Sequence, residues 1–74
     1  LAGANLEGAN LTDANLEDTS LKRANVKDAN LEGANLKNAN LKNADLRGTK
    51  MTDANLEGVD LKNADLRGTG LNKK

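Results

Sequence analysis

Every fifth residue of this chain, starting from Leu1, is aliphatic or methionine, and no other feature constrains the fold as strongly. We call these residues the central positions. They are Leu1, Leu6, Leu11, Leu16, Leu21, Val26, Leu31, Leu36, Leu41, Leu46, Met51, Leu56, Leu61, Leu66 and Leu71. A period of five matches neither the 3.6-residue turn of a helix nor the two-residue alternation of a continuous strand. The chain therefore does not read as an amphipathic helix or as a long strand.

The residues around each central position predict a short extended piece followed by a corner. Two residues before the centre the chain has Ala, Thr or Val, so Ala-x-Leu alternates inward, outward and inward, as in a very short strand. Two residues after the centre it has Gly, Asn or Asp everywhere except at Arg23 and Lys73. These three residue types best tolerate the positive φ that tight corners require.

A second, longer period gives the number of corners in one coil. Residues 42–49 return unchanged at residues 62–69, and residues 12–17 return at residues 52–57. A weaker match of residues 6–11 with residues 31–36 is offset by 25 and does not fit, and we give the longer matches more weight. Four five-residue units with right-angle corners then close a square coil of 20 residues. The 74 residues make about 3.7 such coils.

Tandem Ala-Asn/Asp-Leu-x-x units resemble the pentapeptide repeat family, and the resemblance covers the chain from end to end. It implies an all-β fold, a right-handed quadrilateral β-helix with four pentapeptides per coil. It also implies that the central residue and the residue two before it point inward while the other three point outward. We therefore expect one solenoid over residues 1–74, alone or as part of a longer chain.

Stacking at a strand spacing of about 4.8 Å places residues 20 apart above one another. An inward threonine such as Thr49 then needs a hydrogen-bond partner, and we expect a neighbouring carbonyl. Asn or Asp just before a centre is expected to bond the backbone at the corner. Both ends expose a coil edge and its leucines without an amphipathic cap, so we expect end-to-end self-association or a segment cut from a longer solenoid.

The same stacking predicts columns of charge on the outside. Lys22, Lys42 and Lys62 form a basic column with Arg23 beside it. The simpler interpretation is a solvated surface that keeps the protein in solution. The sharper hypothesis is a face that binds an acidic protein partner, whose identity the sequence does not give.

A second basic column, Lys27, Arg47 and Arg67, is expected to be partly neutralised by Asp45 and Asp65. These two aspartates could together approach a cation, but a hard cation takes about six to eight oxygen ligands, so no metal site is predicted. The two remaining columns carry most of the other acids. One contains Thr12, Glu32 and Thr52 with Asp13 and Asp53, and the other contains Glu17, Lys37 and Glu57 with Asp18 and Asp60.

Several function classes are disfavoured. The chain has no His, Cys or Tyr, and its single serine, Ser20, has no histidine to activate it, so we expect neither an enzyme nor a cofactor. A net charge of zero and the absence of aromatic residues argue against nucleic-acid binding. No apolar run exceeds two residues, so no membrane-spanning helix is predicted, and a soluble, cytoplasmic protein is the default expectation.

Two functions remain. The first is a structural or protein-interaction module, a rigid solenoid that presents flat charged faces. The alternative, suggested by the resemblance, is a DNA mimic that binds and inhibits or protects DNA gyrase. This chain differs from such mimics because it is neutral, lacks Phe at its central positions, and at about 18 Å is too short to match a gyrase-sized duplex.

Overall fold

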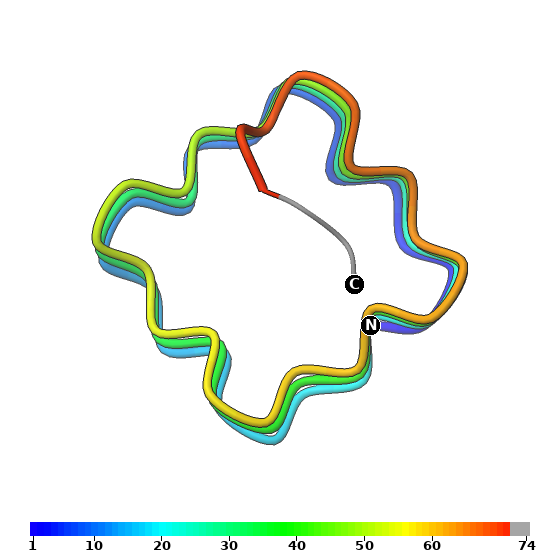
Figure 1. Cartoon of the computed structure of the whole chain (residues 1–74), viewed down its shortest axis with the longest axis horizontal. Coiled ribbons are helices and arrows are strands. Elements are labelled where there is room, and N and C mark those ends of the chain that lie inside the picture. The colour runs from blue at the N-terminus through cyan, green and yellow to red at the C-terminus, as the bar shows by residue number, and fades with distance from the viewer. Residues whose placement is uncertain (72–74) are drawn as a thin grey trace.

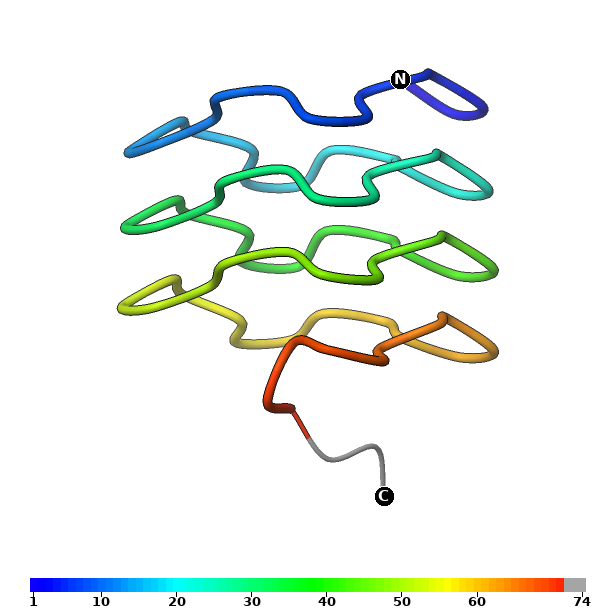
Figure 2. The same ribbon diagram turned by 90° about the horizontal axis from the view of Figure 1, so that it is seen from above.

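The computed structural model of the chain describes residues 1–71, which wind into a stack of four-cornered coils (Figures 1 and 2). Within these residues there is no helix and no strand longer than one residue. Up to residue 65, each five-residue unit instead gives one residue to a parallel β-bridge and two residues to a turn, and residues 66–70 have the turn without a bridge. The predicted short strands are therefore reduced to single bridging residues, because a corner follows before a second ladder residue can pair.

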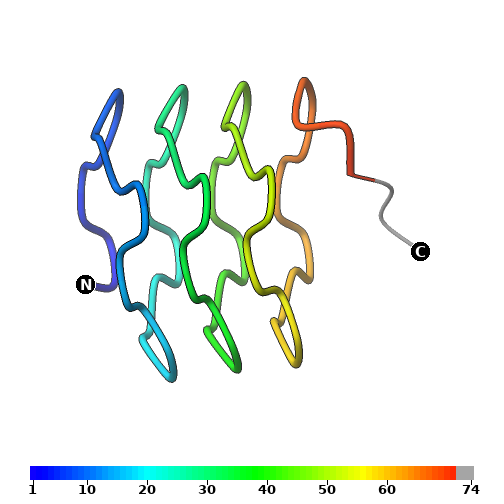
Figure 3. The same ribbon diagram turned by 90° about the vertical axis from the view of Figure 1, so that its left-hand side faces the viewer.

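The bridges confirm the predicted 20-residue coil. They join Asn5–Asn25, Asn10–Asn30, Asn15–Asn35, Ser20–Asn40, Asn25–Asp45, Asn30–Lys50, Asn35–Asn55, Asn40–Asp60 and Asp45–Asp65. Figure 3 shows the resulting coils lying side by side along the stack. In Figure 1 the chain runs counter-clockwise while its C-terminal coils lie nearest the viewer, which is the sense of a right-handed coil.

Every corner is a tight turn with the same backbone signs. The carbonyl of the central residue accepts the N–H three residues later, as between Ala24 and Leu21 at 3.0 Å. From Gly3 to Gly68, the second corner residue always has positive φ, whereas the first does not. This is the sign pattern of a type II turn, which favours Gly or Asn at that place. Arg23 departs only in residue type, because its φ of 63° matches the others; Lys73 lies outside the described residues.

The same set of backbone hydrogen bonds between coils repeats in successive units and fixes the register. In one unit Asn25 donates to the carbonyl of Ala4 at 2.9 Å, Val26 to that of Asp45 at 2.8 Å, and Asp28 to that of Arg47 at 2.8 Å. The N–H groups directly before, at and two residues after a central residue thus all find partners in neighbouring coils. This ladder holds outward side chains 20 residues apart directly above one another.

The interior is a narrow core of leucines and alanines that is complete only in the middle of the stack. Leu36, Leu41 and Leu46 are 0% exposed, whereas Leu1 is 62% exposed and Leu66 is half-buried. The alanines two residues before each centre leave room for four central side chains in one coil. The predicted exposure of end-coil leucines is seen at Leu1.

Inward threonines bond backbone carbonyls, as predicted. The hydroxyl of the buried Thr49 donates to the carbonyl of Leu46 at 3.0 Å, and that of Thr69 donates to Leu66 at 2.7 Å. Thr19 makes a longer contact of 3.5 Å with the carbonyl of Glu17. A threonine therefore lowers the stability of the fold only slightly where it takes the place of alanine in the inner wall.

None of the residues that the structure describes belongs to a helix long and apolar enough to cross a membrane.

Candidate functional site

The four residues predicted to form a partner-binding face lie together at one corner of the stack. Gly3 donates its N–H to the carbonyl of Lys22, Arg23 to that of Lys42, and Asn43 to that of Lys62, each at 2.9 Å. These bonds place the three lysines one coil apart in a single column, with Arg23 as the next residue at the same corner. We call Lys22, Lys42, Lys62 and Arg23 the lysine edge.

The charges of the lysine edge have no partner among residues 1–71, where the recorded ion pairs all involve other residues. The acid nearest in sequence is Asp60, whose Oδ1 accepts the backbone N–H of Lys62 at 3.0 Å. Lys22 and Lys42 are half-buried and Lys62 and Arg23 are exposed. Long basic side chains commonly cover apolar surface with their stems while the charged group stays in water. The edge therefore presents free positive charge.

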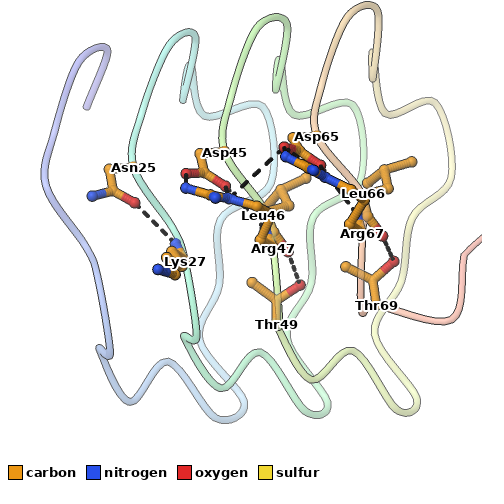
Figure 4. A network of polar contacts seen from close by, with 10 residues as sticks. All are labelled: Asn25, Lys27, Asp45, Leu46, Arg47, Thr49, Asp65, Leu66, Arg67 and Thr69. Atoms are coloured by element: carbon orange, nitrogen blue, oxygen red, sulfur yellow. Dashed lines mark hydrogen bonds and ion pairs between the residues drawn. The ribbon is translucent and has the colours of Figure 1, made fainter.

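The neighbouring corner carries a ladder in which acids and arginines alternate (Figure 4). Arg47 Nη2 lies 2.7 Å from Asp45 Oδ2, and Arg67 Nη2 lies 2.6 Å from Asp65 Oδ2. Arg47 Nε also lies 3.8 Å from Asp65 Oδ2, so it links two coils. We call Asp45, Arg47, Asp65 and Arg67 the Asp–Arg ladder. Its geometry confirms the predicted partial neutralisation of this column, at Arg47 and Arg67.

The Asp–Arg ladder also changes the acidity of its members. The side-chain hydrogen bond from Arg67 lowers the pKa of Asp65 from 3.8 to about 2. The hydrogen bond from Arg47 likewise lowers the pKa of Asp45, and the same contacts raise the pKa of both arginines. These shifts follow from hydrogen bonds to the charged form in a solvated setting. They describe a surface ion-pair network and supply no acid or base suited to catalysis near neutral pH.

The polar residues before the central positions serve the backbone, as predicted. Asn25 Oδ1 accepts the N–H of Lys27 at 3.1 Å, and Asn35 Oδ1 accepts that of Lys37 at 3.0 Å. Asp45 and Asp65 do the same for Arg47 and Arg67 while they bind the guanidinium groups. An Asx oxygen that bonds a nearby N–H stabilises the turn. No three carboxylates within residues 1–71 gather closely enough to hold a metal ion.

One corner contact was not anticipated from the sequence. The side chains of Asp13, Asp28 and Asn38 lean along the stack and fill the space where Gly33, Gly48 and Gly58 lack a Cβ. The signal is present in the sequence, since each pair is an Asp or Asn followed by Gly 20 residues later. It has meaning only after the coil length is known. These glycines thus serve the stacking of corners as well as the turn itself.

The model of the family described as pentapeptide repeats matches residues 1–38 and 29–68 with eight copies of the repeat. The chain belongs to this family. The pentapeptide repeat protein Rfr23 from the cyanobacterium Cyanothece 51142 is 48% identical, with a TM-score of 0.82 over 84% of this chain and 42% of Rfr23. None of the curated proteins compared matches the chain.

Two further solved structures share the fold of this pentapeptide repeat protein. HetL, involved in heterocyst differentiation regulation in the cyanobacterium Nostoc sp. strain PCC 7120, is 37% identical with a TM-score of 0.59 over 92% of this chain and 34% of HetL. QnrB1, a plasmid-mediated fluoroquinolone resistance protein, is 22% identical with a TM-score of 0.60 over 86% of this chain and 38% of QnrB1, and this likeness shows the fold alone. The chain thus spans less than half the length of each of these three proteins.

Proposed function

We propose that this solenoid is a non-enzymatic protein-interaction module whose lysine edge binds an acidic surface of a protein partner. The observation that carries the proposal is the column of unpaired basic side chains at one corner. The neighbouring column of Lys27, Arg47 and Arg67 also has three basic residues, but its two arginines are bound in the Asp–Arg ladder. Of these two columns, the lysine edge is therefore the one whose charges all remain available to a partner.

The backbone makes this edge suited to recognition. Lys22, Lys42 and Lys62 repeat at the coil spacing of about 4.8 Å, so their potentials add along one line. The inter-coil hydrogen bonds fix the positions of their Cα atoms before a partner arrives. A preformed surface loses less conformational entropy on binding than a flexible basic segment does. A carboxylate-rich surface is the complementary partner.

The non-enzymatic part of the proposal follows from residue chemistry. The sequence offers no histidine, cysteine or tyrosine, and the perturbed pKa values lie in surface ion pairs. HetL, which belongs to the same family, is involved in heterocyst differentiation regulation, and a regulatory role of this kind is compatible with a function through binding. The soluble, cytoplasmic setting expected above stays a proposal.

The gyrase-directed DNA mimic stays as the alternative, with less support. A mimic of DNA has to present an excess of negative charge, whereas this chain has a net charge of zero and a basic column at one corner. A gyrase supercoiling assay with the chain in excess tests the alternative directly. Clear inhibition would favour the mimic over the lysine-edge module.

The lysine edge itself is tested with a fluorescein-labelled oligoglutamate peptide by fluorescence anisotropy at low ionic strength. The variant Lys22→Glu/Lys42→Glu/Lys62→Glu is expected to lose binding, because the edge becomes repulsive. The matched control is Lys27→Glu/Lys37→Glu/Lys50→Glu, which makes the same change of charge at other places. It also alters two half-buried lysines and one exposed lysine.

The control variant is expected to keep most of the binding. Circular dichroism checks that both triple variants remain folded. Equal loss in the two variants would show that only total charge matters, and the lysine edge would then be rejected. Binding that survives in the lysine-edge variant would reject it as well.

A further inference from the structure

A column of acids lies at another corner of the same coils. Asp13 donates its N–H to the carbonyl of Glu32 at 2.8 Å, and Gly33 donates to that of Thr52 at 2.9 Å, the residue before Asp53. Asp13, Glu32 and Asp53 thus supply one carboxylate per coil, and we call them the acidic edge. All three are exposed and, within residues 1–71, none is in an ion pair.

The lysine edge and the acidic edge lie across the coil from each other. In one coil the corners follow at residues 22–23, 27–28, 32–33 and 37–38, so the first and third are diagonal. Figure 1 shows the four corners as projections of the coil, with opposite pairs farthest apart. The molecule measures 25 × 24 × 22 Å, whereas screening in physiological salt acts over about 8 Å. The two edges therefore cannot neutralise each other within one molecule.

The two edges are matched in spacing because they belong to the same ladder. Lys22 and Asp13 are 9 residues apart, Lys42 and Glu32 are 10 apart, and Lys62 and Asp53 are 9 apart. A shift of about half a coil along the stack therefore aligns all three pairs at once. If the second stack runs in the opposite direction, Lys42 still meets Glu32 and the outer two pairs exchange partners.

We propose that the lysine edge binds the acidic edge of a second copy of this chain, so that solenoids associate side by side. The inference rests on the proposed function and names its acidic partner. Because different edges meet, each added copy leaves one edge of each kind free, and the contact is open-ended. Two charges oppose it, Asp60 beside Lys62 and Lys50 near Asp53.

We expect this contact between two copies to be weak. Exposed ion pairs contribute little individually and are screened by salt. Two corners that meet also bury far less surface than a stable protein–protein interface. We therefore expect association that grows with protein concentration and disappears when salt is added.

The test is sedimentation velocity of the chain over a concentration series. Runs in about 0.01 M and about 1 M salt change the Debye length from about 30 Å to about 3 Å. The middle pair, Lys42 with Glu32, is the same in both directions of stacking. Lys42→Glu and Glu32→Lys are each expected to weaken self-association by roughly five- to tenfold.

A mixture of the two single variants provides the decisive measurement. The reversed edge of each variant is complementary to the reversed edge of the other, and the intact edge of each is complementary to the intact edge of the other. The mixture is therefore expected to regain association at low salt. Lys37→Glu and Glu57→Lys are the controls, since they make the same charge changes at the position after a central residue in another column. These controls are expected to associate like the unmodified chain.

Each outcome decides between the proposals. Association that persists in Lys42→Glu, as the end-to-end self-association expected from the sequence predicts, overturns the side-by-side contact. A mixture that does not regain association overturns it too. A chain that stays monomeric at low salt rules out the second copy as partner. In that last case the oligoglutamate experiment still decides the proposed function, because it needs no self-association.

Discussion

Two basic columns run along neighbouring corners of this solenoid, and within residues 1–71 only one of them is partly neutralised, at its two arginines. Asp45 precedes Arg47 by two residues, and Asp60 precedes Lys62 by the same distance. Both aspartates accept the backbone N–H of their basic neighbour, at 3.1 Å and 3.0 Å. Arg47 also binds the carboxylate of Asp45 with its guanidinium group, at 2.7 Å, whereas within residues 1–71 Lys62 forms no ion pair.

The difference shows how a repeated backbone can give opposite surface properties. A planar guanidinium presents Nε and Nη in a fork that matches a carboxylate two residues earlier, as the two bonds from Arg47 to Asp45 show. An ammonium group on a flexible stem has no such fork and stays in water. Where an aspartate stands two residues earlier, the choice of Arg or Lys after a central residue thus decides whether the basic side chain is bound internally or free for a partner. Lys22 and Lys42 follow Ser20 and Asn40, which offer no carboxylate at that place.

The largest expected effect comes from truncating a core side chain, because both columns stand on the coils that the core supports. Leu46 is 0% exposed and directly precedes Arg47, so Leu46→Ala should lower the free energy of unfolding by about 2–5 kcal/mol. Leu66→Ala, at the equivalent but half-buried position, should cost less. Urea unfolding followed by circular dichroism measures both. Equal costs would contradict the difference in core packing between middle and end coils.

The next effect concerns the corner beside the Asp–Arg ladder. Gly48 has a φ of +70°, and a Cβ there would meet Asp28 Oδ1. Gly48→Ala should therefore destabilise the fold by about 1–3 kcal/mol. The new Cβ would displace the Asp28 carboxylate, and alanine would have to adopt a left-handed backbone conformation. Gly8→Ala is the control, with a φ of +69° and open space around it. Adding Asp28→Gly should bring the cost at residue 48 down to that at residue 8.

Much of this fold could be predicted because its local and long-range patterns agree. The central leucines, the Gly and Asn corners and the 20-residue match of residues 42–49 with 62–69 all specify one coil. The extent of strand was overestimated, because alternation at Ala-x-Leu does not show that a turn takes the next two residues. Arg23 adopts positive φ against its own preference, since the hydrogen bonds of the stack fix its backbone.

The candidate site was predictable in its columns but not in its contacts. Register alone places Lys22, Lys42 and Lys62 together. Whether an aspartate two residues before a basic side chain forms an ion pair depends on side-chain geometry, which a repeat pattern does not encode. Stacked charges are therefore visible in the sequence, whereas free charges become visible only in the structure.

A smaller effect is the acid sensitivity of the Asp–Arg ladder. The pKa of Asp65 is about 2 in the folded chain and 3.8 ordinarily, so the folded state binds this proton less readily. The stabilisation from Asp65 is fully present above pH 3.8 and is lost as the pH falls toward 2. Asp65→Asn should flatten the decline of the unfolding free energy in that range. Asp53→Asn, at a corner without an ion pair, should leave more of the decline in place.

The smallest change in stability should come from Lys62→Arg, which gives the lysine edge the pairing chemistry of its neighbour. The new guanidinium would stand two residues after Asp60, as Arg67 stands two residues after Asp65, and should bind that carboxylate. An exposed pair of this kind changes stability by less than about 1 kcal/mol. The Nε–H of the new arginine should give a slowly exchanging NMR signal, as those of Arg47 and Arg67 should.

Net charge is unchanged in Lys62→Arg, so binding of the oligoglutamate peptide separates free charge from total charge. Binding should weaken if an internally paired arginine is withdrawn from the partner. The reverse substitution, Arg67→Lys, should release Asp65 and leave a free ammonium group at the Asp–Arg ladder. If Lys62→Arg binds the peptide as well as the unmodified chain while its Nε–H signal shows the ion pair, the contrast between a free and a bound column does not govern recognition. A missing Nε–H signal would instead show that two-residue spacing and a guanidinium are insufficient at this corner, although they suffice for Arg67, which binds Asp65 without a second stacked aspartate.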